Sequence, residues 1–278
     1  IFIITGCMVG PDYVKPAIQA PTVFMYEDKG VQETANTAWW KQFQDPALDA
    51  LINEALANNK NVKIAAANVT KAAAVLIETR SPLFPQLSYS GIGERQRLSE
   101  LNATPLSATV PNPQTSYQVL AGASWEIDLW GRIRRLSESA QAELFATEEA
   151  WRGVILSLVA SVAGDYIQLL GLDEQLAVSK RNMAAYADSV HIFELRFKYG
   201  MVPQMNVEQA RSQYETAAAA IPQIESQIAQ TENALSILLG RNPGHIQRGR
   251  TIHELQQPAV PAGLPSEVLV NRPDVRQA

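Results

Sequence analysis

The sequence predicts a mixed α and β membrane protein that combines long antiparallel α-helical coiled-coil hairpins with one β-hairpin. Two observations point to this class. Apolar residues alternate with small or polar residues from Tyr117 to Leu129, which is the period of a strand with two different faces. Apolar residues from Leu169 to Phe197, and again from Val207 to Leu238, are instead mostly spaced by three and four, which is the period of helices that pair in a coiled coil.

Composition and charge limit the classes of function. Of the 278 residues, 46% are hydrophobic and 18% are charged, which is ordinary for a folded protein. The formal net charge of -5 argues against a nucleic-acid-binding protein, because such proteins usually carry a basic face. The sequence has no run of about 18 apolar residues, so we expect any membrane crossing to be made by strands.

The N-terminus carries a candidate modification site at the single cysteine, Cys7, which excludes an intrachain disulfide. Cys7 follows the apolar run 1–4 and the small residues Thr5 and Gly6. This pattern is similar to the end of a bacterial signal peptide with a lipobox; the alternative is a free cysteine in an apolar terminus. We expect Cys7 to become residue one and to be lipidated, since several acyl chains anchor a protein firmly. Met8 in place of an aspartate favours sorting to the outer membrane.

Two shorter helices are predicted before the hairpin. Residues 8–44 are Pro-rich and aperiodic, which favours an extended segment. Asp45 then predicts a helix N-cap, and the proline after it suits the first helical position. The asparagines 58–59 should break this helix, and an Ala-rich second helix follows over 61–79, ended by a Ser-Pro pair.

A long β-hairpin is predicted within 83–130. The apolar positions of its second strand are Tyr117, Val119, Ala121, Ala123, Trp125, Ile127 and Leu129. Alternating residues from Leu87 to Gly93 predict the partner strand, and the Pro-rich residues 99–115 predict the loop between them. A bilayer-spanning strand needs about 9–11 residues, so this hairpin is long enough to cross a membrane.

A hairpin of a soluble β-sandwich is the alternative interpretation of these strands. A sandwich requires several more strands at short spacing, and none follow in the sequence. A lone hairpin still needs partners for its edges, and a barrel completed by other copies would supply them.

The segment 131–199 has no proline and predicts one helix of roughly 100 Å at 1.5 Å per residue. Gly200 predicts its C-cap, and Pro203 keeps the helix from continuing. Asn206 is the expected N-cap of the returning helix, with Gln209 reaching back to it. The returning helix ends at a glycine, residue 240. Each helix carries a line of apolar residues along one side, here called its seam. Two matching seams joined by a tight turn predict an antiparallel helical hairpin.

Two further features concern the C-terminal half. Pro222 lies inside the returning helix and should bend it and free a carbonyl. Residues 244–278 begin as a Pro-rich connector. Because the chain starts with Ile1 and stops at Ala278 without a turn or cap, we expect a piece of a longer reading frame.

Short segments along the chain carry a resemblance to a known family. They are Gly10–Pro16, Trp40 with Phe43 and Asp45–Leu48, Arg80 with Pro82, Pro85 and Gln86, Ser124–Arg132, Asn233–Gly240 and Arg272–Val275. In this order they resemble the TolC-like outer-membrane factors of bacterial efflux systems, in particular the NodT-type outer-membrane efflux lipoproteins. The likeness covers nearly the whole chain, and Pro222 also has counterparts in that family.

The resemblance implies an architecture and partners. Family members have two homologous repeats and form a homotrimer, and this chain looks like the N-terminal repeat. Each repeat gives a β-hairpin to a trimeric outer-membrane β-barrel and helices to a periplasmic α-barrel. The implied partners are a periplasmic adaptor (membrane fusion) protein, an inner-membrane pump and outer-membrane lipid. The implied segments are 1–7 with the lipobox, 8–44 extended, 45–82 upper helices, 83–130 membrane hairpin, 131–243 helical hairpin and 244–278 connector with the start of the second repeat.

The resemblance also implies roles for particular residues. The alternating apolar positions 117–129 would face lipid, and Ser124, Glu126 and Asp128 would face the lumen or a neighbouring subunit. Trp125 and Trp130 would join an aromatic girdle. The periplasmic tip and adaptor contact would comprise Arg196, Gly200, Met201, Val202 and Asn206. The family often has aspartate where Asn206 stands, so a gating role there and a purely capping role both stay open.

An enzyme is one alternative class. The histidines at 191, 245 and 253 lack metal-ligand spacing, and no Gly-rich phosphate loop is present. The carboxylate pairs lie beside no base or nucleophile, so we expect no catalytic residues, no metal and no cofactor.

A structural coiled-coil envelope lipoprotein without a pore is the second alternative. The coiled-coil pattern alone fits such a spacer. A hairpin of lipid-spanning length, inserted before the long helix, does not fit it, and this favours the channel component.

Overall fold

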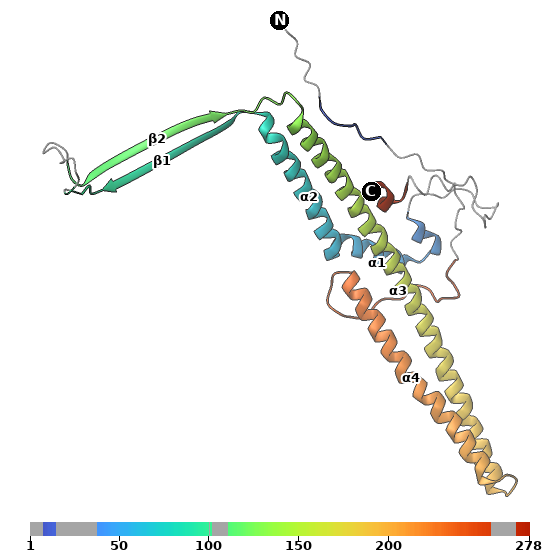
Figure 1. The fold of residues 1–278 in the computed structure, drawn as a ribbon. Helices are drawn as coiled ribbons and strands as arrows, with labels where there is room; N and C mark the ends of the chain where they lie inside the picture. The colour runs from blue at the N-terminus through green and yellow to red at the C-terminus, as the bar shows by residue number, and fades with distance from the viewer. Residues whose placement is uncertain (1–7, 15–37, 100, 102–110, 257–270) are drawn as a thin grey trace. The chain divides into compact units, whose positions relative to one another are not determined.

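The computed structural model describes residues 8–14, 38–99, 101, 111–256 and 271–278. Cys7, the predicted lipidation site, therefore lies outside the described residues. The chain divides into two compact units, one made of residues 1–16 and 70–145 and the other of 17–69 and 146–278. The first unit holds the β-hairpin and the ends of the two helices that adjoin it, and the second holds the remainder of the long helices and the hydrophobic core (Figure 1).

The elements before the hairpin begin with a 3-10 helix, η1 (Trp39–Phe43), followed by α1 (Pro46–Asn58) and α2 (Lys60–Arg80). Asp45 caps α1, since its Oδ1 accepts from the N–H of Ala47 at 2.8 Å. Asn59 separates α1 from α2 and caps α2, since its Oδ1 accepts a hydrogen bond from the N–H of Asn61 at 2.8 Å. The predicted start of α1 and its predicted end are both confirmed.

The β-hairpin consists of β1 (Gln86–Gln96) and β2 (Gln114–Ser124), preceded by the short η2 (Ser81–Leu83). The strands pair antiparallel, with Gln86 opposite Ser124 and Gln96 opposite Gln114. The predicted partner strand is therefore confirmed. Nearly all residues of both strands are exposed, on both faces.

The predicted length of the second strand is wrong at its C-terminal end. Trp125, Ile127 and Leu129 lie beyond β2, which ends at Ser124. The physical reason is the partner strand, because the next position upstream of Gln86 is Pro85, and proline has no N–H to give to a ladder. The Trp125 indole instead donates to the carbonyl of Leu83 at 3.1 Å.

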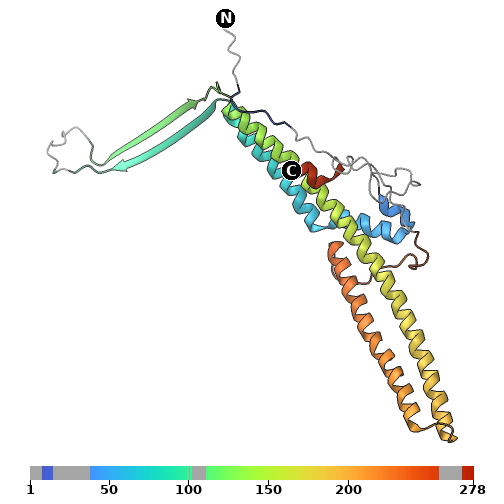
Figure 2. The same cartoon turned by 45° about the vertical axis from the view of Figure 1, so that its right-hand side comes forward.

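Helix α3 (Arg132–Lys198) is a single helix of 67 residues, and α4 (Gln204–Leu238) returns beside it in the opposite direction (Figure 1 and Figure 2). The predicted antiparallel helical hairpin is confirmed. By length and composition alone, α3 would be apolar enough to cross a bilayer, although the sequence has no uninterrupted apolar run of that length. A helix that packs in a protein core passes the same test, so we assign no membrane crossing to α3.

The turn between the helices corrects one prediction. Gly200 has a φ of 71°, its N–H donates to Phe197 O, and Met201 N–H donates to Arg196 O. This pair of bonds is a Schellman motif, so the predicted glycine C-cap is confirmed. Asn206 is not the N-cap, because α4 begins at Gln204 after Pro203 and has no side-chain cap.

The core of the second unit gathers at the end of α4 that is far from the turn. Its buried side chains come mainly from α1, the middle of α3, the end of α4 and the connector 244–256, and include Leu48, Ile52, Leu169, Leu235 and Ile246. Pro222 lies within α4, which remains one helix across it. The last element, α6 (Pro273–Gln277), carries Arg276, whose Nη2 lies 3.0 Å from Glu149 Oε1.

Candidate membrane hairpin, strap and helical tip

The register sorts the side chains of the hairpin onto two faces. One face carries Leu87, Tyr89, Gly91, Gly93 and Arg95 with Thr115, Tyr117, Val119, Ala121 and Ala123. The other carries Gln86, Ser88, Ser90, Ile92, Glu94 and Gln96 with Gln114, Ser116, Gln118, Leu120, Gly122 and Ser124. The first face is mostly apolar and the second mostly polar, as on a strand between lipid and a lumen.

The apolar face is fully open in the single chain. Tyr89 is 91% exposed and Tyr117 is 84% exposed, values that no side chain packed in a core would have. A Cβ added to Gly93 would lie 3.3 Å from the Tyr117 ring. The tyrosine therefore covers the glycine opposite it and fills the gap in this face. Tyr117, Val119, Ala121 and Ala123 share the face, whereas the three predicted positions after Ser124 are not in the strand.

Acidic residues at the strand–helix junction bind arginines of α3. Glu126 receives two hydrogen bonds from Arg132, at 3.0 and 2.6 Å. Asp128 Oδ2 accepts from the backbone N–H of Arg134 at 3.0 Å. The prediction that Glu126 and Asp128 belong to the second face of the strand is wrong, because both follow the end of β2 and hold the first turn of α3.

An N-terminal strap, residues 8–12, lies against the same junction. Val9 N–H donates to Trp130 O at 3.1 Å, and Arg135 binds Asp12 Oδ1 at 2.7 Å and Gly10 O at 3.2 Å. A Cβ on Gly131, whose φ is 79°, would lie 2.9 Å from Met8 Cγ. The residue that follows Cys7 is therefore fixed beside the base of the hairpin.

The predicted tip residues come together in the turn between α3 and α4. Arg196 gives its carbonyl to the Schellman motif, and its guanidinium lies 5.8 Å from the centre of the Phe193 ring. Gly200, Met201 and Val202 form the turn, and Asn206 lies in the first turn of α4. Three large exposed side chains at this turn are Tyr199, Met201 and Met205. Tyr199 and Met205 lie within the predicted turn, but no contact role was predicted for either of them.

A buried polar cluster at the base of the helical hairpin was also missed. The Tyr166 hydroxyl donates to Asp45 Oδ2 at 2.7 Å and accepts from Gly249 N–H at 2.9 Å. Burial, together with the hydrogen bond to Asp45, raises the pKa of Tyr166. Asp45 Oδ2 also accepts from Arg250 N–H at 3.2 Å. The Asp45 carboxylate thus caps α1 and also connects it, by hydrogen bonds, to α3 and to the connector 244–256.

Arg248 of the connector bridges the two long helices. Its guanidinium binds Asp173 of α3 at 2.9 Å and the Glu232 carboxylate of α4. Burial acts to raise the pKa of Glu232, but hydrogen bonds from Arg248 and Ile246 outweigh it, so the pKa lies below its ordinary value. His245 lies 3.0 Å from the same carboxylate.

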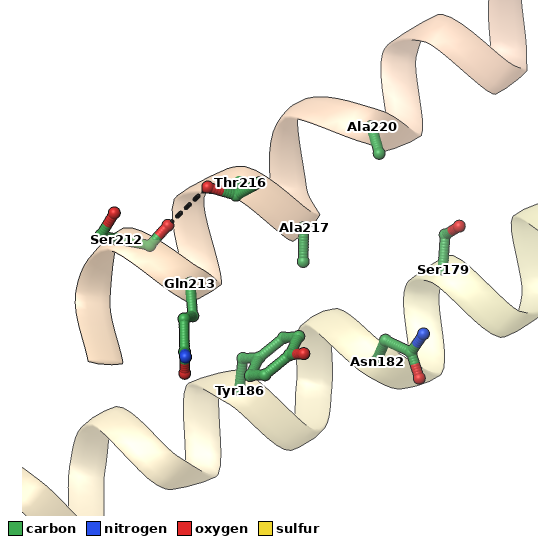
Figure 3. A pocket seen from close by; sticks show the side chains of 8 residues that line it. All are labelled: Ser179, Asn182, Tyr186, Ser212, Gln213, Thr216, Ala217 and Ala220. Carbon is green, nitrogen blue, oxygen red and sulfur yellow. Dashed lines mark hydrogen bonds between the residues drawn. The ribbon is translucent and has the colours of Figure 1, made fainter. Parts of the chain in front are cut away.

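Farther toward the tip, a groove of about 420 Å³ separates the two helices. Its lining comprises Ser179, Asn182, Tyr186, Ser212, Gln213, Thr216, Ala217 and Ala220. Figure 3 shows Gln213 and Ala217 of α4 pointing toward α3, with Tyr186 below them. Small and polar side chains occupy this part of the seam, which leaves it incompletely filled.

Groups suited to catalysis do not converge in the part of the chain that the structure describes. Within it, no group of three or more His, Cys, Asp or Glu residues could hold a metal ion. His253, like His245, lies beside a glutamate, at 3.9 Å from Glu174. The polar clusters instead connect helices and the connector, which suits a framework.

Sequence comparisons identify relatives of this architecture. The family described as "Outer membrane efflux protein" matches residues 51–241. The chain is similar to the cation efflux system protein CusC of Escherichia coli O6:H1, with 33% identity over 99% of this chain and 59% of the relative. It is also similar to the solvent efflux pump outer membrane protein SrpC of Pseudomonas putida, with 35% identity over 100% of this chain and 60% of the relative. The chain thus spans less than two thirds of either relative.

Solved structures agree with the sequence comparisons. The outer-membrane channel OprN superposes with a TM-score of 0.79 at 26% identity, over 98% of this chain and 61% of that chain. Crystal structures of CusC give a TM-score of 0.78 at 31% identity, over 98% of this chain and 60% of that chain. The match covers the hairpin, the long helices and the turn together, and the chain belongs to the outer membrane efflux protein family.

Proposed function

We propose that the chain is part of an outer-membrane channel through which a tripartite efflux system exports small molecules. The observation that carries the proposal is the hairpin, whose strands of 11 residues have one apolar and one polar face, both exposed. Strands of that length cross a bilayer, and a face of large exposed apolar side chains needs lipid to cover it. The names of the relatives, a cation efflux protein and a solvent efflux pump component, support export.

The barrel and the trimer belong to the same proposal. A two-stranded sheet has unpaired outer edges, and closure into a barrel is the arrangement that removes edges inside a membrane. Hairpins from three copies, together with the hairpins of a second repeat, would build such a barrel in the outer membrane. The long helices would line a periplasmic α-barrel, with Ala217 and its small neighbours allowing close approach of helices.

Lipidation at Cys7 is proposed as a second attachment to the outer membrane. The strap supports it, because Met8 packs against Gly131 directly below the hairpin. Acyl chains on the preceding residue would enter the membrane beside the base of the barrel. Trp125 and Trp130 lie in the same junction, where indole rings suit the membrane interface.

The turn between α3 and α4 is proposed as a periplasmic tip that contacts an adaptor protein, which in turn connects to an inner-membrane pump. Exposed Tyr199, Met201 and Met205 support this assignment, since aromatic residues and methionine are enriched at protein interfaces. Asn206 lies in the first turn of α4 and is half-buried, so we propose no ionic role for it.

Transport through this channel requires no reacting group from the chain. The polar face of β1 and β2, rich in serine and glutamine, would line the pore and keep it wet. Movement through it would be passive, driven by the pump. Opening would shift a two-state equilibrium of the helical tip when the adaptor binds it.

The test measures which hairpin face touches lipid. A fluorophore is attached to Val119→Cys on the apolar face or to Gln118→Cys on the polar face, and the protein is inserted into vesicles that carry a lipid-bound quencher. We expect quenching at position 119 and little at position 118. Unsubstituted chain corrects for label on Cys7. Equal exposure of both labels to water would instead favour a coiled-coil spacer without a pore.

A further inference from the structure

The apolar face of the hairpin carries one charged side chain, Arg95. The register pairs Arg95 with Thr115, two positions beyond the Gly93–Tyr117 pair, so its Cβ lies on the same face as Tyr89 and Val119. Arg95 is exposed. Arg95 forms no ion pair with the residues that the structure describes, whereas Arg132, Arg134 and Arg135 at the other end of the hairpin all form one.

The position of Arg95 along the strand is as informative as its face. β1 has 11 residues, beginning at Gln86 next to η2 and ending at Gln96. A strand of about 9–11 residues spans the bilayer, so a residue next to the last one lies at the far margin of the apolar band. A charge on the lipid face is unfavourable at the midplane and tolerated near the interface. If the hairpin spans the outer membrane as proposed above, Arg95 lies at the depth of the distal headgroups.

The chain just beyond Arg95 is held in place. Leu98 N–H donates to Asn112 Oδ1 at 2.9 Å, and Asn112 Nδ2 donates back to Leu98 O at 3.0 Å. These bonds close the neck of the loop directly after the strand. They fix the level at which β1 ends, and so the level of the guanidinium.

We propose that Arg95 binds a phosphate group of the outer-leaflet glycolipid. The inference rests on the proposed membrane role of the hairpin. A planar guanidinium presents parallel N–H donors that match two phosphate oxygens, and such charge-assisted bonds are among the strong ones. A phosphate in the headgroup layer would neutralise the Arg95 guanidinium and accept its hydrogen bonds, which hydrocarbon chains cannot do. Glu94, at the same depth on the polar face, is directed away from this lipid and would not repel it.

The experiment measures retention of lipid A by the full chain in detergent, counted by native mass spectrometry. The variants are Arg95→Gln and Arg95→Lys, with Glu94→Gln as a control that changes charge at the same depth on the other face. We expect Arg95→Gln to weaken retention of bisphosphorylated lipid A about tenfold, the effect of losing one bidentate charged contact. Arg95→Lys should retain an intermediate amount, and Glu94→Gln the full amount.

Two further arms identify the source of the phosphate. The unsubstituted chain should retain dephosphorylated lipid A poorly. Its retention should match that of bisphosphorylated lipid A by the Arg95→Gln variant. Inorganic phosphate should not displace the lipid, because it lacks the acyl chains that cover Tyr89 and Val119. Equal retention by Arg95→Gln and the unsubstituted chain, or equal retention of dephosphorylated lipid, would overturn the proposal and favour a carboxylate of another copy as the partner.

The label at Val119→Cys separates this failure from a failure of the proposed function. If that label contacts lipid while Arg95→Gln retains lipid A normally, only the phosphate contact is wrong. If the label stays in water, the membrane hairpin and the phosphate contact are both wrong.

Discussion

Two tyrosines on α3 separate the two halves of the helical hairpin. Tyr166, in the half nearest the core, is 0% exposed, and its hydroxyl makes two hydrogen bonds. Tyr186, in the half nearest the turn, is 39% exposed and lines the groove. Both halves pair α3 with α4 (Figure 2). The difference is a third layer, since α1 and the connector 244–256 cover the first half, whereas among the described residues the second half has only its own two helices.

The comparison shows that the apolar spacing of a coiled coil determines which helices pair. The segments that pack around the pair determine how deeply its apolar side chains are buried. Two helices alone leave side chains of their seam partly exposed to water, as at Tyr186 and Phe197. We therefore expect the core half to be stable within one chain, and in the proposed assembly further copies or partners would cover the tip half. Variants of matched residues in the two halves can test this.

The largest effect is expected for Gly249→Ala in the core half. The added Cβ would lie 2.0 Å from Asp45 Oδ1 and 3.0 Å from Ala47 Cβ, so the connector must move away and its hydrogen bonds to Tyr166 and Asp45 break. We expect a loss of about 3 kcal/mol in the free energy of unfolding, as for severe overpacking. Urea denaturation measures it.

Gly164→Ala in α3 is the control for this variant. A Cβ there meets nothing within 4 Å, so the variant should gain about 0.5–1 kcal/mol from the better helix propensity of alanine. Equal stabilities of the two variants would show that the connector is not packed as described.

A smaller effect is expected when the two tyrosines lose their hydroxyl groups. Tyr166→Phe leaves the Gly249 N–H without its buried acceptor and removes one of the hydrogen bonds to Asp45, which should cost about 2 kcal/mol. Tyr186→Phe changes a half-exposed side chain and should cost less than about 0.5 kcal/mol. Hydrogen exchange of residues 244–256 should accelerate in the first variant and stay unchanged in the second. Similar acceleration in both would remove the distinction between the halves.

The core half should also respond to pH through Glu232. Its folded-state pKa lies below the unfolded value, so its contribution is fully present above the unfolded pKa and is lost as the pH falls through the folded pKa. Stability should decline in that acidic range, below about pH 4.5. Glu232→Gln removes the charged partner of Arg248 and should cost about 1–2 kcal/mol at neutral pH.

Denaturant titrations at several pH values measure this effect. In Glu232→Gln the stability difference from the unsubstituted chain should shrink as the pH falls through the folded pKa. A difference that stays constant with pH would assign the cost to packing instead of to the ion pair.

The smallest effect is expected from filling the groove in the tip half. Ala217→Leu adds apolar volume to a groove of about 420 Å³ and should raise stability by about 0.5–1 kcal/mol. Ala219→Leu, on the exposed side of α4, is the matched control and should have little effect. The contrary result, destabilisation by Ala217→Leu alone, would show that the groove closes on its own in solution.

Local signals in the sequence predicted local structure well. The Asp-Pro pair at 45–46 predicted the start of α1, and Gly200 predicted the end of α3, because each acts within one helical turn. The start of α4 was mispredicted for a related reason. Asn206 is a good capping residue, but α4 already begins at Gln204. Pro203 therefore takes the N-cap position, and its side chain has no oxygen that could accept a hydrogen bond from the first turn.

Contacts between distant residues could not be predicted in this way. Tyr166 lies 121 positions from Asp45 and 83 from Gly249, and the seam pattern of α3 gives no sign of a hydroxyl partner. The end of β2 was missed because it depends on Pro85 of the opposite strand. Of the predicted strand positions, Tyr117 to Ala123 fall on one face as expected, since a period of two needs no knowledge of the rest of the fold.

The open edges of the hairpin have a consequence for how the protein assembles. β1 pairs only with β2 in the described chain, and an isolated two-stranded hairpin is at best marginally stable in water. In the proposed barrel its ordered fraction should therefore obey mass action, rising with the concentration of chains that supply neighbouring strands. At high dilution the helical core would fold first and the hairpin would remain unpaired until other strands arrive. A folding midpoint measured on the helices would then be independent of protein concentration, and one measured on the strands would not.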